Sequence, residues 1–459
     1  MIPFTLEDCA KVVAGKIQSF DVEASDLNLA AEIKNIVIDS REDCEQALFV
    51  CIKGENFDGH DFAKKAMTQG AIACITERVL PNISRQILVK DARLSLRQLA
   101  TYIRDKVNPL VVAVTGSNGK TTVKEMLACV FNEEDKLLVT QGNYNNEIGV
   151  PLTLFRLESQ HKYAVIEMGA NHAQEIATLT AIAKPNIAII TNIGPAHLDG
   201  FGSLEGVAHA KSEIFQGLEA SGVAIINGDT HFVGVMEQAA QPHEIVKVGC
   251  SENYHISVDK IEQNKDTLHF QMCYQKVNTS VSLSCLGEHN AVNAGLVFAA
   301  GIKAGLKRDT IIEKLQQFKN VGGRLSTYQG FKGAKLLDDA YNANFDSVKA
   351  GLATLAKFDG YRLFVFGDMY ELGKQAEAYH QQVGEVASQL GIDEMCSFGK
   401  LSQRATEAFT GRKQHFDTQS DLVAYLQSEI QTNYVILLKG SRGVQLDQVV
   451  NALKITEEE

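Results

Sequence analysis

Several features of membrane, secreted and nucleic-acid-binding proteins are missing from this sequence of 459 residues. No apolar run reaches the roughly 18 residues that span a bilayer, and Met1–Asp8 shows no basic segment followed by an apolar one, as a secretory signal would. Positive charge is also scarce, because 44 Lys and Arg face 56 Asp and Glu and give a formal net charge of -12. We therefore expect a cytoplasmic protein with no membrane insertion and no nucleic-acid partner.

Cysteine pairing motifs are absent as well. The nine cysteines are dispersed and include no Cys-x-x-Cys pair. This pattern favours reduced, mostly buried thiols over a disulfide framework or a zinc site. The hydrophobic share of 45% and the charged share of 22% are ordinary for a globular protein. One hydrophobic core rarely organises so long a chain, so we expect more than one domain.

Two joints divide the chain. A helix predicted over Arg93–Lys106 is broken at Asn108-Pro109, because proline cannot continue a helix. Further on, Gly322-Gly323 follows a second helical stretch. These joints predict domains over residues 1–108, 109–322 and 323–459, each of ordinary domain size.

The middle domain has the clearest pattern. Its short apolar runs are separated mostly by helical stretches, which is typical of a parallel sheet covered by helices on both faces. The runs lie at Leu110–Val114, Tyr163–Ile166, Ile187–Ile190 and Val223–Ile226. The last domain repeats this pattern of apolar strands and helices and is expected to be Rossmann-like. The first domain mixes strands and helices. The predicted fold class is therefore α/β, with a central parallel-sheet domain flanked by two further α/β domains.

A phosphate-binding loop follows the first of these strands. Glycines let backbone N–H groups converge on phosphate oxygens, and the N-terminus of the next helix adds partial positive charge. That helix carries an apolar face at i, i+3, i+4, i+7 and i+8 from Val123. The general motif has a glycine where this chain has Val114, so the loop is the shortened form Gly-x-x-Gly-Lys-Thr. We expect ATP to bind to Gly116, Ser117, Asn118, Gly119, Lys120, Thr121 and Thr122.

Side chains suited to a metal ion accompany the loop. We expect Lys120 to lie between the β- and γ-phosphates and the Thr121 hydroxyl to hold Mg²⁺. Glu167 follows the strand that begins at Tyr163, and its carboxylate oxygens suit this hard cation. His197 lies just past another strand, although a lone histidine is more often structural than catalytic. The residues alone therefore predict a Mg²⁺-ATP site centred on the loop.

Together these motifs resemble those of the Mur ligase family, over essentially the whole chain. The shortened loop, Glu167 in Glu-Met-Gly-Ala-Asn-His and His197 match that family's nucleotide and metal motifs. Lys211, in Ala-His-Ala-Lys-Ser-Glu, matches a lysine to which the family adds CO₂ to form a carbamate. The resemblance implies two Mg²⁺ ions held by Thr121, Glu167, His197 and carbamylated Lys211, with Lys120, Lys211 and His197 serving catalysis.

The resemblance extends to nucleotide contacts beyond the loop. Asn290, in His-Asn-Ala-Val-Asn, matches an asparagine that contacts adenine, a role that suits an amide donor and acceptor. Arg324, just after the second joint, matches an arginine that helps to position the nucleotide. In Leu-Asp-Asp-Ala-Tyr, either Asp338 or Asp339 matches an aspartate that contacts the nucleotide.

Other segments resemble the branch of the family that adds D-alanyl-D-alanine to UDP-N-acetylmuramoyl-tripeptide, whose third residue is lysine or diaminopimelate. They are Asp39–Arg41, Gly54–Phe62, Gly142–Gly149, Gly367–Met369, Glu371–Gly373 and Lys439–Arg442. The resemblance implies that the N-terminal domain binds the UDP-sugar, that the C-terminal domain binds the dipeptide and that the protein is a monomer. It assigns substrate contacts to Ser40, Arg41, His60, Asn145, Asn146, Tyr341 and Asn344.

The activity implied by the resemblance is ATP-dependent amide ligation through an acyl phosphate, for the synthesis of peptidoglycan precursors. Two alternatives within the same superfamily are another Mur-type ligase and a folylpolyglutamate-type ligase. A third alternative, from another class, is a P-loop nucleotide switch. Guanine-specific switches use Asn-Lys-x-Asp, and Asn264-Lys265-Asp266 has the wrong spacing for that motif.

Overall fold

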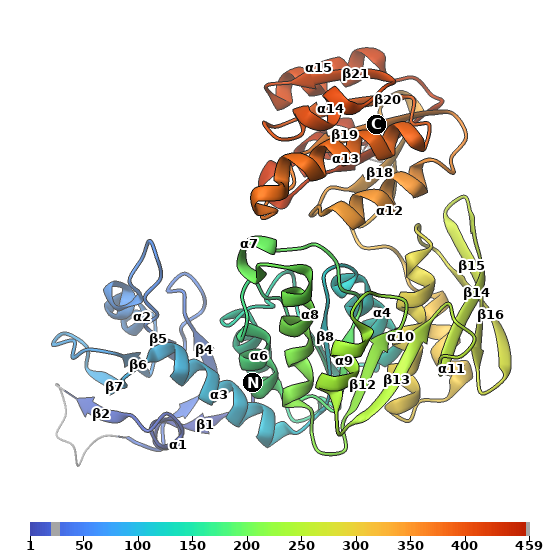
Figure 1. Cartoon of the computed structure of the whole chain (residues 1–459). Helices are drawn as coiled ribbons and strands as arrows, with labels where there is room; N and C mark the ends of the chain where they lie inside the picture. Colours follow the sequence, from blue (N-terminus) through green and yellow to red (C-terminus); the bar gives the residue numbers. More distant parts are fainter. Residues whose placement is uncertain (20–27, 456–459) are drawn as a thin grey trace.

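The computed structural model describes residues 1–19 and 28–455 (Figure 1). Three large β-sheets follow one another along the chain, of 5, 9 and 6 strands. In Figure 1 they form an N-terminal body in blue, a central body from cyan to yellow and a C-terminal body in orange and red. A further two-stranded sheet pairs β1 (Phe4–Thr5) with β3 (Glu32–Ile33).

The N-terminal sheet has the strand order β2-β7-β6-β5-β4. All neighbouring pairs are parallel except β2 with β7. The predicted mixture of strands and helices is confirmed. The bounds are α1 Leu6–Val12, β2 Lys16–Ser19, β4 Asn35–Val37, β5 Ala47–Val50, η2 Gly59–Phe62, α2 Ala63–Thr68, β6 Ala73–Thr76, β7 Arg85–Leu88 and α3 Ala92–Val107.

The central sheet has the order β16-β15-β14-β13-β12-β11-β8-β10-β9. All four predicted apolar runs form parallel strands, and β8, which leads into the phosphate loop, lies between β11 and β10. The strands of this part are β8 Leu110–Thr115, β9 Leu137–Val139, β10 Tyr163–Glu167, β11 Ile187–Ile190, β12 Val223–Asn227 and β13 Glu244–Gly249.

Helices cover both faces of this sheet, as the apolar runs predicted. On one face, Val112 and Val114 pack with the buried side chains of α4 and α10. On the other face, Val111 and Ala113 pack with α3, α5 and α6 in a cluster that continues into the N-terminal body. The bounds are α4 Lys120–Phe131, α5 Gly149–Phe155, α6 Glu175–Ala183, α7 Leu198–Phe201, α8 Leu204–Ser212, α9 Val233–Ala240, α10 His289–Lys303 and α11 Arg308–Gln316.

The central sheet differs from the sequence-based picture at one edge. There β14 (Ile256–Asn264) continues into β15 (Thr267–Tyr274) and β16 (Val277–Leu283) as an antiparallel meander. In these strands partly or fully exposed residues interrupt the buried ones, so they lack the continuous apolar runs that mark the parallel strands.

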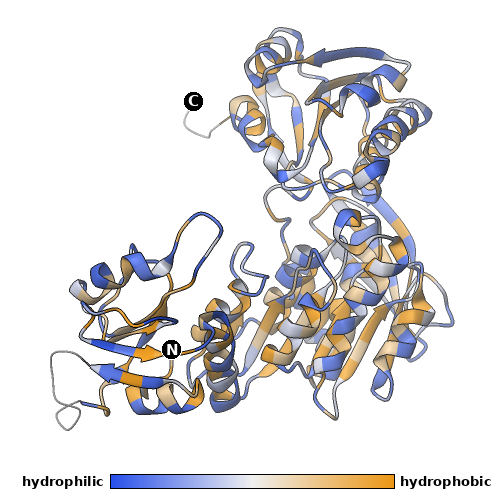
Figure 2. Cartoon of the chain, turned by 60° about the vertical axis from the view of Figure 1, so that its left-hand side comes forward, coloured by the Kyte–Doolittle hydropathy of each residue, from blue (hydrophilic) through white to orange (hydrophobic). Residues whose placement is uncertain are grey.

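The C-terminal sheet has the order β17-β18-β22-β19-β20-β21 and is parallel except for β17 with β18. Figure 2 shows apolar residues along its strands and on the inner sides of its helices. The predicted Rossmann-like style is confirmed. The bounds are β17 Ser326–Gln329, β18 Lys335–Asp339, α12 Phe345–Leu355, β19 Tyr361–Gly367, α13 Ala376–Gln389, β20 Glu394–Phe398, α14 Gln403–Ala408, β21 Arg412–Phe416, α15 Gln419–Glu429, β22 Tyr434–Lys439 and α16 Asp447–Leu453.

Two expectations from composition concern membrane-spanning helices and the state of the cysteines. Over residues 1–19 and 28–455, no helix combines the length and apolarity that crossing a membrane would require. All nine cysteines lie within this part of the chain as free thiols, and most of them are buried.

Candidate active site

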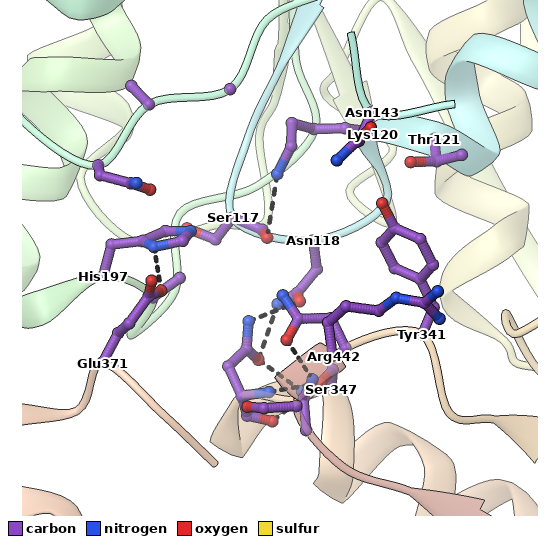
Figure 3. Close-up of a pocket in the computed structure, with 18 of the residues that line it drawn as sticks. Ser117, Asn118, Lys120, Thr121, Asn143, His197, Tyr341, Ser347, Glu371 and Arg442 are labelled. Atoms are coloured by element: carbon purple, nitrogen blue, oxygen red, sulfur yellow. Dashed lines mark hydrogen bonds and ion pairs between the residues drawn. The ribbon is translucent and has the colours of Figure 1, made fainter. Parts of the chain in front are cut away.

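A pocket of about 430 Å³ lies where the carboxyl ends of the central strands meet the C-terminal body. This edge of a parallel sheet is where ligands of such folds bind, and the volume is in the usual range for a small-molecule site. One wall carries the phosphate loop and the segments after β10 and β11. The other carries residues of the C-terminal body, including Tyr341, Glu371 and Arg442 (Figure 3).

The phosphate loop has the backbone geometry that its glycines were expected to provide. Gly116 has φ +148°, and a Cβ there would lie 2.0 Å from Thr191 Oγ1, so no larger residue fits. Gly119 has φ +80° and begins α4 without a side-chain cap hydrogen bond. The first backbone N–H groups of a helix have no partner within the helix, so the start of α4 can receive an anion.

Residues after β11 support the loop. Asn192 Oδ1 accepts a hydrogen bond of 2.8 Å from the Asn118 backbone N–H. Ser117 Oγ donates to the Gly194 carbonyl and accepts from the Gly194 N–H, both at 2.9 Å. The sequence assigned no role to Asn192 or Gly194, although residues directly after a parallel strand lie at the usual binding edge of the sheet.

Lys120 folds back over the loop. Its Nζ donates to the Gly116 carbonyl at 2.7 Å and approaches the Ser117 carbonyl at 3.5 Å. Burial lowers the pKa of the Lys120 ammonium below its usual value, while the charge of Glu167 opposes this shift. The cation is therefore held directly above the backbone that would surround a phosphate group.

Thr121 and Glu167 meet across the pocket. The Thr121 hydroxyl donates to Glu167 Oε2 at 3.0 Å, and Asn145 Nδ2 donates to Glu167 Oε1 at 2.8 Å. Glu167 is only 3% exposed, and its backbone N–H donates to Thr140 Oγ1. A buried carboxylate beside a hydroxyl offers the oxygen donors that Mg²⁺ prefers, so these residues fit that ion.

His197 does not join this pair directly. Its Nδ1 contacts Glu371 Oε2 of the C-terminal body, and this contact lowers the pKa of Glu371 (Figure 3). His197 has φ +54°, a conformation that is uncommon for residues other than glycine and that is found at functional sites. Among residues 1–19 and 28–455, no three His, Cys, Asp or Glu side chains lie close enough together to hold a metal ion by themselves.

Lys211 is 1% exposed at the end of α8. Its Nζ donates to the Ala170 carbonyl at 3.3 Å and lies 5.2 Å from the centre of the Phe201 ring. Burial, with a smaller contribution from the charge of Lys120, lowers the pKa of Lys211 to about 7. Lys211 is therefore a buried residue of the pocket wall.

The C-terminal body reaches the phosphate loop through Arg324 and Asn344. The Arg324 guanidinium stacks 4.2 Å from the centre of the Tyr341 ring, and its Nη2 lies 3.4 Å from Thr121 Oγ1. Asn344 and Asn118 exchange two amide hydrogen bonds, of 2.7 and 3.2 Å. The phosphate loop is therefore tied directly to the start of α12.

The two aspartates left open by the sequence differ in their partners. Asp338 accepts hydrogen bonds from the backbone N–H groups of Gly323 and Ala340, and burial raises its pKa. Asp339 pairs with the buried ammonium of Lys439. Neither lines the pocket. Asp338 thus fastens the second joint, whereas Asp339 anchors a buried cation.

The remaining predicted residues lie outside the pocket lining. Asn290 is buried, donates to the Leu286 carbonyl and accepts from Asn293. In the N-terminal body, Ser40 is buried, Arg41 pairs with Asp39, and the His60 ring lies between Asp58 and the Glu77 N–H.

The pocket brings together most of the predicted nucleotide, metal and dipeptide residues. The lining includes Ser117, Asn118, Gly119, Lys120, Thr121, Asn145, Asn146, Glu167, His197, Lys211, Arg324, Tyr341 and Asn344. Gly116 and Thr122 belong to the same loop, but both are buried and do not line the pocket. Lining residues to which sequence reasoning gave no role include Glu175, Ser347, Tyr370, Glu371, Ser441 and Arg442.

Family models match three stretches of the chain. They are described as the Mur ligase family catalytic domain over residues 32–131, the Mur ligase middle domain over 114–301, and the Mur ligase glutamate ligase domain over 323–442. The chain belongs to the Mur ligase family. Its sequence is 39% identical over 457 residues to the UDP-N-acetylmuramoyl-tripeptide–D-alanyl-D-alanine ligase of Escherichia coli K12, covering 99% of each chain.

Solved structures of the family agree with this Mur ligase over most of its length. The MurF crystal structure from Acinetobacter baumannii superimposes with a TM-score of 0.92 at 34% identity and covers 98% of both chains. MurF ligase from Thermotoga maritima in complex with ADP gives a TM-score of 0.84 at 28% identity, over 92% of this chain and 97% of that one. The predicted α/β architecture of three successive domains is the one that these structures share.

Proposed function

We propose that this Mur ligase joins D-alanyl-D-alanine to UDP-N-acetylmuramoyl-tripeptide with consumption of ATP, forming ADP and phosphate in peptidoglycan precursor synthesis. The proposal is carried by one observation: the phosphate loop, the Thr121–Glu167 pair and the C-terminal wall face a single pocket. The names of the relatives and the ADP bound to the T. maritima enzyme support the substrates and the nucleotide.

A carboxylate is a poor acyl donor, so ATP first converts it to an acyl phosphate. One carboxylate oxygen of the tripeptide attacks the γ-phosphorus, and the bond to ADP breaks. The approach of two anions is unfavourable, and the ammonium of Lys120 and the N–H groups at the start of α4 offset that repulsion. The dipeptide amine then attacks the acyl carbon, loses a proton and expels phosphate as the C–N bond forms.

Thr121 and Glu167 would hold Mg²⁺, which when bound neutralises phosphate charge during transfer. His197 and Lys211, which line the same pocket, would complete this metal layer. A carbamate on Lys211 fits its surroundings, because the buried amine has one carbonyl partner, Ala170, and Lys120 is close enough to influence its charge. A carbamate would replace a buried cation by an anion that a metal can neutralise.

The carbamate has its own test. With ¹³C-bicarbonate, the wild-type protein should give a carbamate resonance in the ¹³C NMR spectrum, and Lys211→Met should lack it. A wild-type spectrum without that resonance would remove the carbamate from the proposal without affecting the ligase activity.

Arg324 and either Asp338 or Asp339 are proposed to position the nucleotide, with Asn290 at the adenine. Ser40, Arg41 and His60 would contact the UDP-sugar, and Asn145, Asn146, Tyr341 and Asn344 the peptide substrates. The domains would be residues 1–108, 109–322 and 323–459, acting as a monomer in the cytoplasm.

Phosphate release tests the function. Purified protein with ATP and UDP-N-acetylmuramoyl-tripeptide should release phosphate at a rate that depends on added D-alanyl-D-alanine. Release that ignores the dipeptide but responds to a single amino acid would assign the chain to another Mur-type ligase. Slow hydrolysis that responds to neither substrate would favour a nucleotide switch.

A further inference from the structure

Two loops of the C-terminal wall lie side by side at the pocket. β19 and β22 are adjacent parallel strands, and the loops that follow them begin at Asp368 and Gly440. The Tyr370 N–H donates to Ser441 Oγ at 2.9 Å, and the Ser441 N–H donates to the Asp368 carbonyl at 2.9 Å. The carboxyl ends of adjacent parallel strands form the usual binding edge of such sheets.

Each loop presents one charged side chain, and the two charges are opposite. Glu371 follows β19 and Arg442 follows β22, and both line the pocket. Their side chains are 53% and 62% exposed, so solvent or a ligand can reach them. Figure 3 shows Glu371 turned toward His197 and Arg442 nearer to Tyr341.

The other carboxylates of the lining are already engaged. Glu167 accepts from Thr121 and Asn145, and Glu175 accepts from the backbone N–H groups of Asn171 and His172. Glu371 has instead a single contact with His197. Among the lining residues, Glu371 is thus the carboxylate best placed to receive a cationic group of a ligand.

The cationic side chains of the lining also differ in how firmly they are already engaged. Lys120 lies over the phosphate loop, Lys211 is buried, and Arg324 is stacked on Tyr341 beside Thr121. Arg442 makes an exposed ion pair with Asp447 at 3.1 Å. Such surface pairs contribute little, so a ligand carboxylate can replace Asp447, and a guanidinium binds a carboxylate through two parallel hydrogen bonds.

We propose that Glu371 and Arg442 bind the two ends of the incoming dipeptide, with its ammonium group at Glu371 and its terminal carboxylate at Arg442. This inference rests on the proposed ligase activity and adds the orientation of its second substrate. The amine lies near His197 and the phosphate loop, where the acyl carbon is attacked. The carboxylate points along the wall toward Tyr341, away from the reacting atoms.

Arg442→Gln tests the carboxylate end with two substrates, D-alanyl-D-alanine and D-alanyl-D-alaninamide, whose terminus is neutral. The wild-type enzyme should prefer the acid by about 10- to 100-fold in kcat/KM, as expected for a charge-assisted contact. The variant should lose that preference, with little change for the amide. Arg404→Gln is the matched control, because Arg404 is an exposed arginine on the same body that pairs with Glu377 and Glu407.

Equal losses of kcat/KM for the acid and the amide in Arg442→Gln would overturn the proposal. A rise in KM for UDP-N-acetylmuramoyl-tripeptide alone would also overturn it, because Arg442 would then bind a carboxylate of that substrate. These outcomes all require an active wild-type enzyme. If wild-type phosphate release never depends on a dipeptide, the proposed function itself fails, and the two failures are therefore distinguishable.

Glu371→Gln tests the amine end. It should raise the KM for D-alanyl-D-alanine about 10-fold or more, and leave the inhibition constant of N-acetyl-D-alanyl-D-alanine and the KM for ATP unchanged. The acetylated dipeptide has no ammonium group, so its binding would not use Glu371. If the variant bound both dipeptides more weakly by the same factor, Glu371 would act only on the shape of the loop. That result would overturn this half of the proposal.

Discussion

The two walls of the pocket are built differently. At the centre of the central wall, the buried Glu167 carboxylate accepts hydrogen bonds from Thr121 and Asn145. The C-terminal wall carries half-exposed side chains such as Glu371 and Arg442. Groups that stabilise charge during a reaction must be held in place beforehand, whereas groups that capture a substrate must be reachable. The difference separates the chemistry of the site from substrate recognition.

The largest expected effect concerns a buried ion pair beneath the C-terminal wall. Lys439 is buried, pairs with Asp339 and donates to the Asn342 carbonyl at 3.1 Å. Lys439→Met leaves a carboxylate buried without its partner, which should cost about 3–5 kcal/mol of unfolding free energy. Urea denaturation measures this loss, with the exposed Lys400→Met as control. A loss of unfolding free energy below about 1 kcal/mol would mean that this ion pair does not hold the wall in place.

A second prediction concerns the central wall. Lys120→Met should lower kcat for phosphate release about 10²- to 10³-fold, because one preorganised charge that faces the phosphate is lost. Thermal stability should change little. Lys136→Met is the matched control, since Lys136 is a partly exposed lysine of the same body that pairs with Glu133. An unchanged kcat in the Lys120 variant would contradict the assignment of chemistry to this wall.

The metal layer gives a third prediction. Glu167→Gln should raise the Mg²⁺ concentration for half-maximal activity about 10- to 100-fold, because a neutral amide is a weaker ligand for a hard cation. Glu175→Gln is the control, as Glu175 lines the same pocket but accepts from backbone N–H groups. Magnesium titrations of phosphate release compare the two. Equal shifts would show that the effect is one of overall pocket charge.

The smallest effect is expected where the walls touch. Asn118→Ala, Asn344→Ala and the double variant form a double-mutant cycle for the reciprocal amide pair. Its coupling energy should be about 0.5–1.5 kcal/mol, the range for a neutral hydrogen bond. The cycle removes the separate cost of losing Asn344 as the N-cap of α12. A coupling of zero, measured by thermal unfolding, would mean that the two walls do not support each other.

Much of the fold was predictable because its parallel strands are buried on both faces. Continuous apolar runs such as Ile187–Ile190 cannot be mistaken for alternating strands, and the structure confirms all four in the central sheet. The meander of β14–β16 was not predicted, because polar and exposed residues interrupt its apolar ones and its sequence resembles a polar connection.

The site was predictable in part for a related reason. The phosphate loop is recognisable from its local sequence. Glu167 and His197 are recognisable from their positions after strands. Glu371 and Arg442 also follow parallel strands, but their segments, Glu371–Gly373 and Lys439–Arg442, stand out only through the family resemblance, which assigns no role to either side chain. Contacts between bodies, such as Asn118 with Asn344, depend on how two bodies meet, and no local pattern encodes that.

The apolar cluster that runs from the N-terminal body into the central one has a consequence for how the chain unfolds. Leu96 and Leu99 of α3 belong to the same core as Phe4 and Ala113, whereas the C-terminal sheet has cores of its own. Calorimetry should therefore resolve two cooperative units rather than three. Cleavage of the chain at the second joint should therefore leave two soluble pieces. Cleavage at the first joint should expose core side chains and lead to aggregation.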